Sequence, residues 1–170
     1  AKILVIDILI RVMIKKNFWN FLFIFLIFVA DRLTKLFVIN SVEKFGQTSI
    51  YQSSFLDINL IWNSGIAFGL FSFDDKIYYN LMTAMIVVII LIILWFITKT
   101  KNTEKIAFMM VFGGALGNIF DRLYYTSVPD FIDIHVGDLH WFIFNVADIF
   151  ISLGIILLIC LEFYLKKKYD

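Results

Sequence analysis

Four long apolar segments dominate the chain, and shorter polar or mixed stretches separate them. The segments cover residues 18–39, 77–97, 106–125 and 142–165. A hydrocarbon core about 30 Å thick requires roughly 20 apolar residues in helical conformation, and each segment meets that length. In lipid only helices and closed barrels satisfy their backbone hydrogen bonds, and continuous apolar runs are typical of helices. The pattern therefore predicts an all-α membrane protein with four transmembrane helices.

Two of the connections, residues 40–76 and 126–141, are polar or mixed. Within the first, the run SSFLDINLIWN (53–63) alternates apolar and polar residues, which indicates strands. The run IAFGLFSF (66–73) follows it and suits a segment lying along the membrane interface. We expect a small β platform between the first and second helices, and we interpret 126–141 as a short polar connection.

Residues 1–16 are apolar but too short before Arg11 to span a bilayer, and they lack a small-residue cleavage site. We therefore expect no removable signal peptide here. The stretch is either a cytoplasmic flank or the result of a start set upstream of Met13, and we assign it no function. The whole chain, 1–170, is interpreted as one integral membrane domain.

The basic residues predict the orientation of the chain. They gather before the first segment, between the second and third, and after the fourth, at Lys15, Lys16, Lys99, Lys101, Lys105, Lys166, Lys167 and Lys168. The connection 40–76 has two lysines against four acidic residues, and 126–141 has no Lys or Arg. The positive-inside rule then places both termini in the cytoplasm and both connections outside.

The composition agrees with a membrane protein. The 170 residues are 61% hydrophobic and 17% charged, with a mean hydropathy of +0.88. Soluble domains are nearer half apolar and a quarter charged. A net charge of +1 argues against a nucleic-acid partner. The single cysteine, Cys160, excludes an intrachain disulfide, and we expect it to be a buried packing residue.

With this orientation, the polar residues within or next to the apolar segments all fall near the outer leaflet. They are Asp31, Arg32, Thr34, Lys35, Asn63, Asn118, Asp121, Arg122, Asn145 and Asp148. Ionisable groups in a membrane are costly and mark sites of chemistry or transport. The pattern predicts one polar site at the external membrane boundary.

Asp130 and Asp148 are candidates for catalysis. Two carboxyl groups held close together share one proton, and such a pair can activate a water and protonate a leaving amine. Asp121, Asp133 and Asp138 compete for this role, and each carboxylate could instead cap a helix or face lipid headgroups. From the residues alone, a non-catalytic membrane carrier or assembly factor with a polar pocket is an alternative.

Spacing suggests further contacts around this site. Asp31 and Lys35 are four residues apart and are expected to form an ion pair. Asn118 and Arg122 have the same spacing, so their side chains can converge. Asp121 is adjacent to Arg122 and is expected to contact another helix.

His135 and His140, with Asp133 and Asp138 nearby, raise the possibility of a metal site. Zinc sites usually need three or four protein ligands, and the signature H-E-x-x-H is absent. We expect no metal and no other cofactor. A metal-dependent intramembrane hydrolase is the third alternative.

Five motifs in order resemble those of the bacterial lipoprotein signal peptidases, the type II signal peptidases. DRLTK (31–35) is similar to D-x-x-(S/T)-K, NSGIAFG (63–69) to N-x-G-A-A-F, GGALGNIFDR (113–122) to G-G-A-x-G-N-x-x-D-R, VPDFID (128–133) to V-V-D-F, and FNVAD (144–148) to F-N-x-A-D. The resemblance extends over about residues 18–165. It implies a membrane aspartyl endopeptidase with Asp130 and Asp148 as its catalytic pair.

The same resemblance implies the remaining site residues. Those expected to bind substrate are Asn63, Gly65, Asn118, Arg122 and Asn145. Those expected to support them are Asp31, Lys35 and Asp121. This chain departs from the family motifs at two positions. Pro129 stands where the motif has a second Val, and Ile66 stands where the motif has a small residue. Pro129 is expected to stiffen the approach to Asp130.

The resemblance also implies the substrate, a prolipoprotein whose cysteine carries diacylglycerol and which is cut just before that cysteine. The expected location is the bacterial cytoplasmic (inner) membrane, with the site at the outer leaflet and in contact with membrane lipids. Inhibition by globomycin-type cyclic peptides is expected on the same ground.

Overall fold

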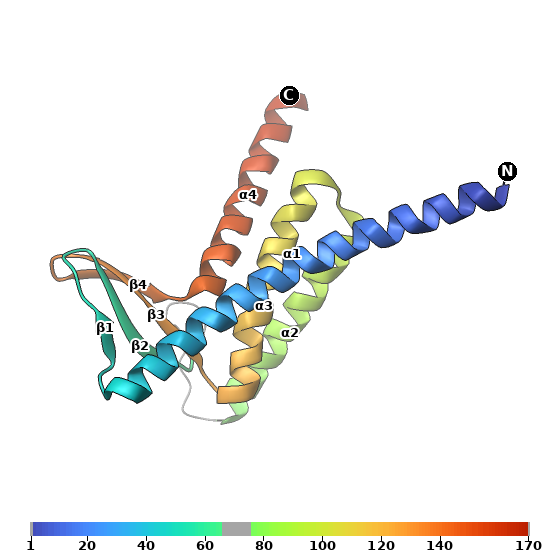
Figure 1. Cartoon of the computed structure of the whole chain (residues 1–170). Coiled ribbons are helices and arrows are strands. Elements are labelled where there is room, and N and C mark those ends of the chain that lie inside the picture. The colour runs from blue at the N-terminus through green and yellow to red at the C-terminus, as the bar shows by residue number, and fades with distance from the viewer. Residues whose placement is uncertain (1, 66–75, 170) are drawn as a thin grey trace.

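The computed structural model describes residues 2–65 and 76–169, and the side chains of 17–65 and 77–166. The described residues form, in chain order, α1 (Lys2–Phe45), β1 (Ser49–Tyr51), β2 (Leu56–Asn63), α2 (Lys76–Lys99), α3 (Asn102–Tyr125), β3 (Val128–Val136), β4 (Leu139–Phe144) and α4 (Val146–Tyr169). The long α1 crosses the other helices, and the sheet lies beside its C-terminal end (Figure 1). The segment 66–73 and the departure at Ile66 fall outside the described residues.

Three helices of the described chain are long and apolar enough to cross a membrane. They are Ile77–Lys99, Asn102–Tyr125 and Val146–Lys166. The second and third predicted segments are thus confirmed. The helix α1 is not among these three. It begins at Lys2 and continues without a break to Phe45, so the backbone of 2–16 belongs to the same helix as the first predicted segment.

The centre of the helical body is α3, which packs against α1, α2 and α4. Its contact with α4 is close because Gly114 lies against the backbone of Ala147. A Cβ at position 114 would stand 2.5 Å from the Ala147 carbonyl oxygen. Small residues allow this kind of approach between membrane helices. The packing brings the polar end of α3 next to the first turn of α4.

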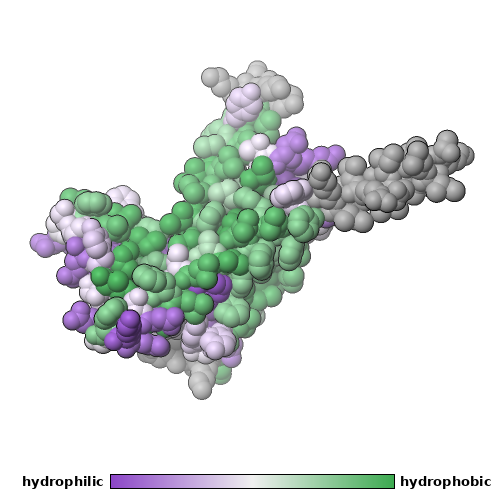
Figure 2. Space-filling view, in the orientation of Figure 1, coloured by the Kyte–Doolittle hydropathy of each residue, from purple (hydrophilic) through white to green (hydrophobic). Residues whose placement is uncertain are grey.

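The outer faces of the helices are apolar. Figure 2 shows hydrophobic residues over most of the helical body, with hydrophilic residues gathered beside the sheet and at the opposite end. Cys160 lies on α4 and is exposed, so the expectation that it is buried is wrong. The sequence pattern misled here because an apolar run in a membrane helix can face lipid as readily as protein.

A four-stranded antiparallel sheet joins the two connections, in the order β1-β2-β3-β4. The predicted platform is present, but only β1 and β2 come from residues 40–76. The stretch 126–141 is not a short polar connection, because it holds β3 and the beginning of β4. Strand β2 pairs with β3 from Leu56 opposite Ile134 to Asn63 opposite Val128. This pairing spans more than sixty residues of sequence, which local patterns do not reveal.

The predicted start of the fourth segment is also wrong. Residues 142–144 belong to β4, and α4 begins at Val146. Trp141 and the three residues after it are apolar, so hydropathy alone merges the end of the strand with the helix. The corrected boundary puts Asn145 at the junction and Asp148 in the first turn of α4.

Pro129 is the second residue of β3 and is almost fully buried. It lies opposite Trp62 of β2, and the strand continues past it to Val136. Proline is tolerated at the beginning of a strand, where its missing N–H costs little. Val128 before it is in extended conformation, as proline favours.

Candidate active site

Asp130 and Asp148 line the same cavity, whose volume is about 270 Å³. Asp130 comes from the third position of β3 and is 4% exposed, and Asp148 comes from the first turn of α4. The cavity is otherwise lined by Asn63, Ile86, Ala115, Asn118, Arg122, Val128, Ile151, Ser152 and Ile155. The two carboxyl groups therefore face one small space with mostly apolar walls.

Asn145 connects the two carboxyl groups. Its backbone N–H donates to Asp148 Oδ2, and its side-chain oxygen accepts from the backbone N–H of Asp148, both at 3.1 Å. This reciprocal pair is a capping box at the N-terminus of α4. Its Nδ2 donates to Asp130 Oδ1 at 2.6 Å. Because its oxygen is engaged in the cap, the amide turns its NH₂ group toward Asp130.

Asn63 and Asn118 hold the other two carboxyl oxygens in the same way. Asn63 Nδ2 donates to Asp130 Oδ2 at 2.7 Å, and its Oδ1 accepts from the backbone N–H of Gly65 at 2.8 Å. Asn118 Nδ2 donates to Asp148 Oδ1 at 2.8 Å. Each of the four carboxyl oxygens thus accepts one hydrogen bond, and a second lone pair on each remains for a proton or a water.

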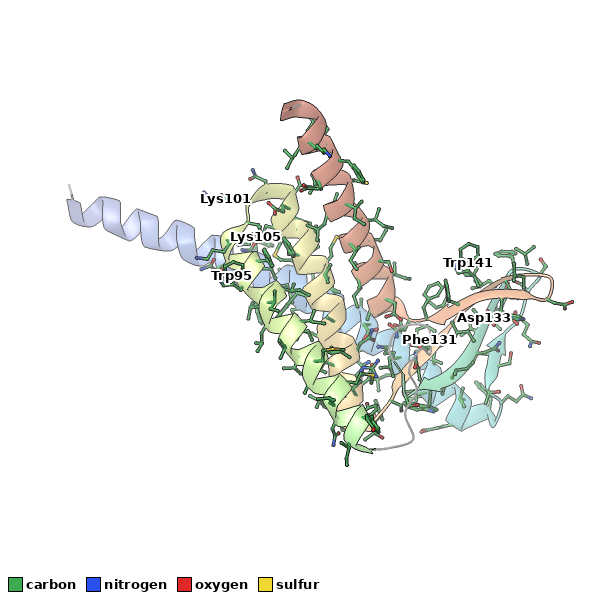
Figure 3. The ribbon with its side chains drawn as sticks, turned by 180° about the vertical axis from the view of Figure 1, so that it is seen from behind. Trp95, Lys101, Lys105, Phe131, Asp133 and Trp141 are labelled. Carbon is green, nitrogen blue, oxygen red and sulfur yellow. The ribbon has the colours of Figure 1, made fainter. Side chains whose placement is uncertain are left out.

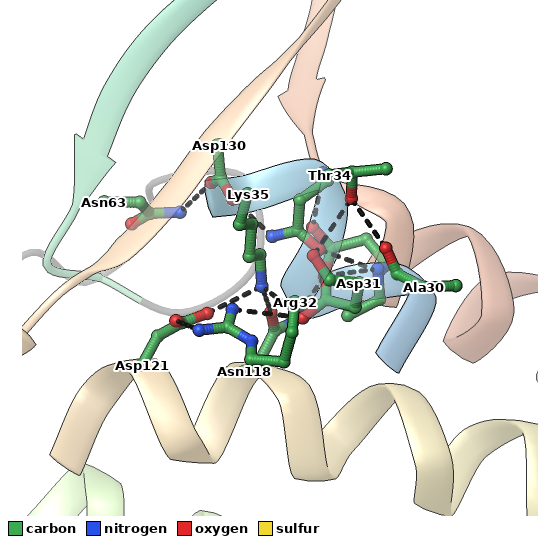
Figure 4. A network of polar contacts seen from close by, with 12 residues as sticks. Ala30, Asp31, Arg32, Thr34, Lys35, Asn63, Asn118, Asp121 and Asp130 are labelled. Carbon is green, nitrogen blue, oxygen red and sulfur yellow. Dashed lines mark hydrogen bonds and ion pairs between the residues drawn. The ribbon is translucent and has the colours of Figure 1, made fainter. Parts of the chain in front are cut away.

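Beneath this pair lies a buried ionic network, centred on Lys35 (Figure 4). The Lys35 ammonium donates to Asp31 Oδ2 at 2.9 Å, to Asn118 Oδ1 at 2.8 Å and to Asp121 Oδ2 at 2.6 Å. The expected pairing of Asp31 with Lys35 and the expected contact of Asp121 with another helix are both confirmed. Asp31, Lys35 and Asp121 are fully buried, so the network stabilises charges that would otherwise be very costly.

The α3 backbone leaves room for this network at Gly117. A Cβ there would collide with the Asp31 carboxylate, whose Cγ would be 3.0 Å away. Asp31 Oδ1 also accepts from the backbone N–H of Ala147 at 3.0 Å. One carboxylate on α1 is therefore held against both α3 and the N-terminus of α4.

The competing carboxylates lie elsewhere. Asp121 belongs to the ionic network, and Asp138 is exposed in the turn between β3 and β4. Asp133 is buried on β3 (Figure 3), and its carboxylate contacts His140 Nδ1 at 2.9 Å. His135 lies near a different carboxylate, Asp57, at 3.3 Å. Among the side chains that the structure describes, no three His, Cys, Asp or Glu residues are grouped to hold a metal ion.

The environment changes the acidity of Asp130. Burial, followed by the charge of the neighbouring Asp148 carboxylate, raises the pKa of Asp130 to about 6. The hydrogen bonds from Asn63 and Asn145 and the charge of Lys35 act in the opposite direction. Asp130 therefore keeps its proton to a higher pH than an exposed aspartate, which suits a general acid.

Two predicted binding residues fix the chain beside the cavity. Arg122 lines the cavity and donates from Nη2 to the Gly65 carbonyl at 2.6 Å. Its own carbonyl accepts from the Tyr79 hydroxyl at 3.2 Å. Asn118 and Arg122 thus face the same cavity, but each binds a different partner. Gly65 is buried and takes part through its backbone.

A second, more apolar pocket of about 460 Å³ adjoins the carboxyl pair at Asp148. It is lined by Ile134, Trp141, Phe142, Phe144, Asp148, Ile149, Ser152 and Leu153. Asp148 and Ser152 line both pockets. Trp141 projects from β4 near the start of α4 (Figure 3). Sequence reasoning missed this pocket because residues 142–144 were assigned to a helix.

Comparison with known proteins agrees with this site. Residues 23–164 match the family model of signal peptidase (SPase) II. The chain is 46% identical over 154 residues to the lipoprotein signal peptidase of Pelagibacter ubique (strain HTCC1062), covering 90% of this chain and 93% of that relative. It is 40% identical over 152 residues to the lipoprotein signal peptidase of Francisella tularensis subsp. novicida (strain U112), covering 87% and 93%.

The fold also has solved counterparts. A bacterial membrane enzyme matches with a TM-score of 0.75 and 28% identity, covering 89% of this chain and 91% of its own. A second bacterial membrane enzyme matches with a TM-score of 0.68 and 29% identity, and the match covers 84% of this chain and 91% of that enzyme's chain.

The apolar helices, the two carboxyl groups that line one cavity and these likenesses define a membrane aspartic peptidase. The chain belongs to the signal peptidase II family, which confirms the resemblance seen in the five motifs.

Proposed function

We propose that this enzyme removes the signal peptides of diacylglyceryl-modified prolipoproteins, hydrolysing the peptide bond just before the lipidated cysteine. The observation that carries the proposal is the carboxyl pair, Asp130 and Asp148, which lines one small cavity with every oxygen held by an asparagine. The lipoprotein signal peptidases among the relatives support the substrate class.

In the proposed reaction, Asp130 and Asp148 share one proton. The Asp148 carboxylate takes a proton from a water, whose oxygen attacks the scissile carbonyl carbon, while Asp130 gives its proton to the carbonyl oxygen. The tetrahedral intermediate collapses as its C–N bond breaks and the cysteine nitrogen is protonated. The signal peptide leaves with a new carboxyl group, one water is consumed, and the pair again holds a single proton.

The second pocket suits the lipid part of such a substrate. Its lining is mostly aromatic and aliphatic, and it reaches Asp148. Acyl chains contribute about 0.8 kcal/mol per buried CH₂, so even partial burial of the diacylglyceryl group supplies much of the binding free energy. An acyl chain of the substrate bound in this pocket would bring the lipidated cysteine close to the carboxyl pair.

For the membrane topology, we propose that α1 supplies a fourth span, with both termini in the cytoplasm and the sheet at the outer leaflet of the inner membrane. The lysines at the ends of the apolar segments support this orientation. Thiol labelling of Asp138→Cys and Lys101→Cys from outside intact cells, each with Cys160→Ser so that one cysteine remains, tests it. Only the cysteine at position 138 should react. Labelling at position 101 alone would show that the chain has the opposite orientation.

A gel-shift cleavage assay with purified protein tests the catalytic proposal. The substrates are a diacylglyceryl-modified prolipoprotein and its unmodified form. Asp130→Asn and Asp148→Asn should each lower the cleavage rate of the lipidated form by about 10³-fold or more, as loss of a central catalytic group does. The unmodified form should be cut poorly by the wild type.

Asp133→Asn and Asp138→Asn are the matched controls, since they remove carboxylates from the same hairpin but outside the cavity. Both should cleave within a few-fold of wild type, with or without a chelator. Cleavage that survives Asp130→Asn and Asp148→Asn would overturn the assignment. A folded wild type that binds but never cuts the lipidated substrate would favour the carrier alternative.

A further inference from the structure

Arg32 belongs to the polar cluster predicted at the outer leaflet, but the sequence assigned it no role there. Its Nη1 is 2.5 Å from Asp121 Oδ1, and its Nη2 is 3.2 Å from Asp31 Oδ2. The guanidinium also lies over the ring of Phe120, 5.0 Å from its centroid. Phe120 in turn packs edge-to-face on Phe28. With 11% of its side chain exposed, Arg32 is an ion-pair partner in an environment of low polarity.

Arg32 balances the charge of the buried network. The network contains two carboxylates, Asp31 and Asp121, and both are fully buried. Lys35 supplies one positive charge, and its three hydrogen bonds are all in use. Without Arg32 one negative charge would remain uncompensated in the protein interior, with Asp121 Oδ1 deprived of its cation (Figure 4).

Two short routes connect this network with the carboxyl pair. On one, Lys35 holds Asn118, whose NH₂ group donates to Asp148. On the other, Asp31 accepts from the backbone N–H of Ala147, the residue before Asp148. A change of charge or position in the network therefore reaches Asp148 through a single intervening group.

We propose that Arg32 is a positioning residue for the peptidase reaction. Together with Lys35 it neutralises the carboxylates of Asp31 and Asp121, and so keeps Lys35 on Asn118 and the net charge of this network at zero. This inference rests on the proposed roles of Asp130 and Asp148. The family motif D-x-x-(S/T)-K leaves the position of Arg32 variable, so the inference comes from the contacts of this chain.

The charge balance predicts a specific change in pH dependence. The charged groups facing the site are Asp31, Arg32 and Lys35 from α1, Asp121 and Arg122 from α3, Asp148 from α4 and Asp130 from β3. Removal of the Arg32 charge leaves this set more negative, which makes protonation of the carboxyl pair easier. The whole pH profile of kcat/KM should then move to higher pH, by roughly one unit for charges separated by about 10 Å.

The experiment compares four variants of the full-length enzyme by the pH dependence of kcat/KM on a lipidated substrate. Arg32→Gln should shift the profile to higher pH, and Asp121→Asn should shift it to lower pH. Arg32→Gln with Asp121→Asn restores a balanced charge and should return the profile to within about 0.3 units of wild type. Arg32→Lys keeps the charge and should keep the profile.

A merely structural role would give a different pattern. Activity would fall in Arg32→Gln with no shift of the profile, and the double variant would be at least as impaired as either single variant, which would overturn the proposal. If Arg32→Gln does not fold, the direction of the shift in Asp121→Asn decides, and a shift to higher pH or none overturns it. Failure of the proposed function itself is recognised separately, because Asp130→Asn would then still cleave.

Discussion

The ammonium of Lys35 donates to Asn118 Oδ1 at 2.8 Å, and this bond decides which end of the Asn118 amide faces Asp148. With its oxygen engaged by Lys35, Asn118 presents its NH₂ group to Asp148 Oδ1. A fully buried lysine on α1 therefore orients a carboxyl group on α4 through one asparagine on α3. Three of the predicted site residues act as one chain of contacts.

Lys35→Met should lower the free energy of unfolding of the protein. It leaves Asp31 and Asp121 with only Arg32 as a cation, and breaking a buried ion pair by removing one partner costs about 3–5 kcal/mol. Thermal or denaturant unfolding in detergent measures the change. Lys44→Met is the matched control, because Lys44 is exposed near the end of the same helix. Equal stability of the two variants would show that the network contributes little.

Asn145 has two separable roles, and two substitutions distinguish them. Asn145→Ser keeps a side-chain oxygen for the helix cap but loses the bond to Asp130, whereas Asn145→Ala loses both. Both variants should therefore lose activity by a similar factor of about ten or more. Only Asn145→Ala should lose a further ~1 kcal/mol of stability. Full activity in Asn145→Ser would mean that the bond to Asp130 does not matter for the reaction.

The raised pKa of Asp130 predicts how stability depends on pH. Its value of about 6 in the folded chain exceeds the ordinary value of 3.8. The native state therefore binds more protons than the unfolded state between these values, and this group's contribution to stability is lost as pH rises from about 4 to 6. A rise of about two pKa units corresponds to roughly 3 kcal/mol.

Asp130→Asn removes this dependence. The stability of the variant relative to wild type should increase from pH 4 to pH 7 by about 2–3 kcal/mol and then stay constant. Comparison at each pH cancels the titration of groups that do not interact with Asp130, such as Asp57, whose pKa is lowered chiefly by a hydrogen bond from the Ser53 backbone. A difference that does not change with pH would contradict the raised pKa.

Trp141 tests the proposed lipid pocket. It lines the apolar pocket and is 70% exposed, so Trp141→Ala should weaken binding of the acyl chains. KM for the lipidated substrate should rise about tenfold with little change in kcat, which is the sign of lost uniform binding. Phe55→Ala is the control, because Phe55 is an exposed aromatic residue just before β2 and outside the pocket. Equal effects of the two substitutions would argue against a specific pocket.

The sequence predicted the parts of the structure that depend on local pattern. The hydropathy of the segments 77–97 and 106–125 located α2 and α3, and spacing of four predicted the pair of Asp31 with Lys35. The candidate residues Asn63, Asn118 and Asn145 were all chosen from the motifs, and the structure brings each of them to Asp130 or Asp148.

The sequence could not predict contacts between distant segments. The pairing of β2 with β3 depends on register across the chain, and the hydrogen bond of Ala147 to Asp31 depends on helix packing. The strand at 139–144 was lost because its apolar residues run directly into those of α4. Arg32 was placed in the polar cluster without a role, because its partner, Asp121, is almost ninety residues away and the two meet only when α1 packs on α3.

Infrared difference spectroscopy of the carboxyl stretch tests most directly whether Asp130 and Asp148 share one proton. The wild type should show a protonated carboxyl group that titrates near pH 6 and disappears in Asp130→Asn. In Asp148→Asn the same group should titrate at lower pH, because the neighbouring negative charge is gone. A carboxyl group of Asp130 that is already ionised at pH 5, or whose titration is unchanged by Asp148→Asn, would contradict a shared proton.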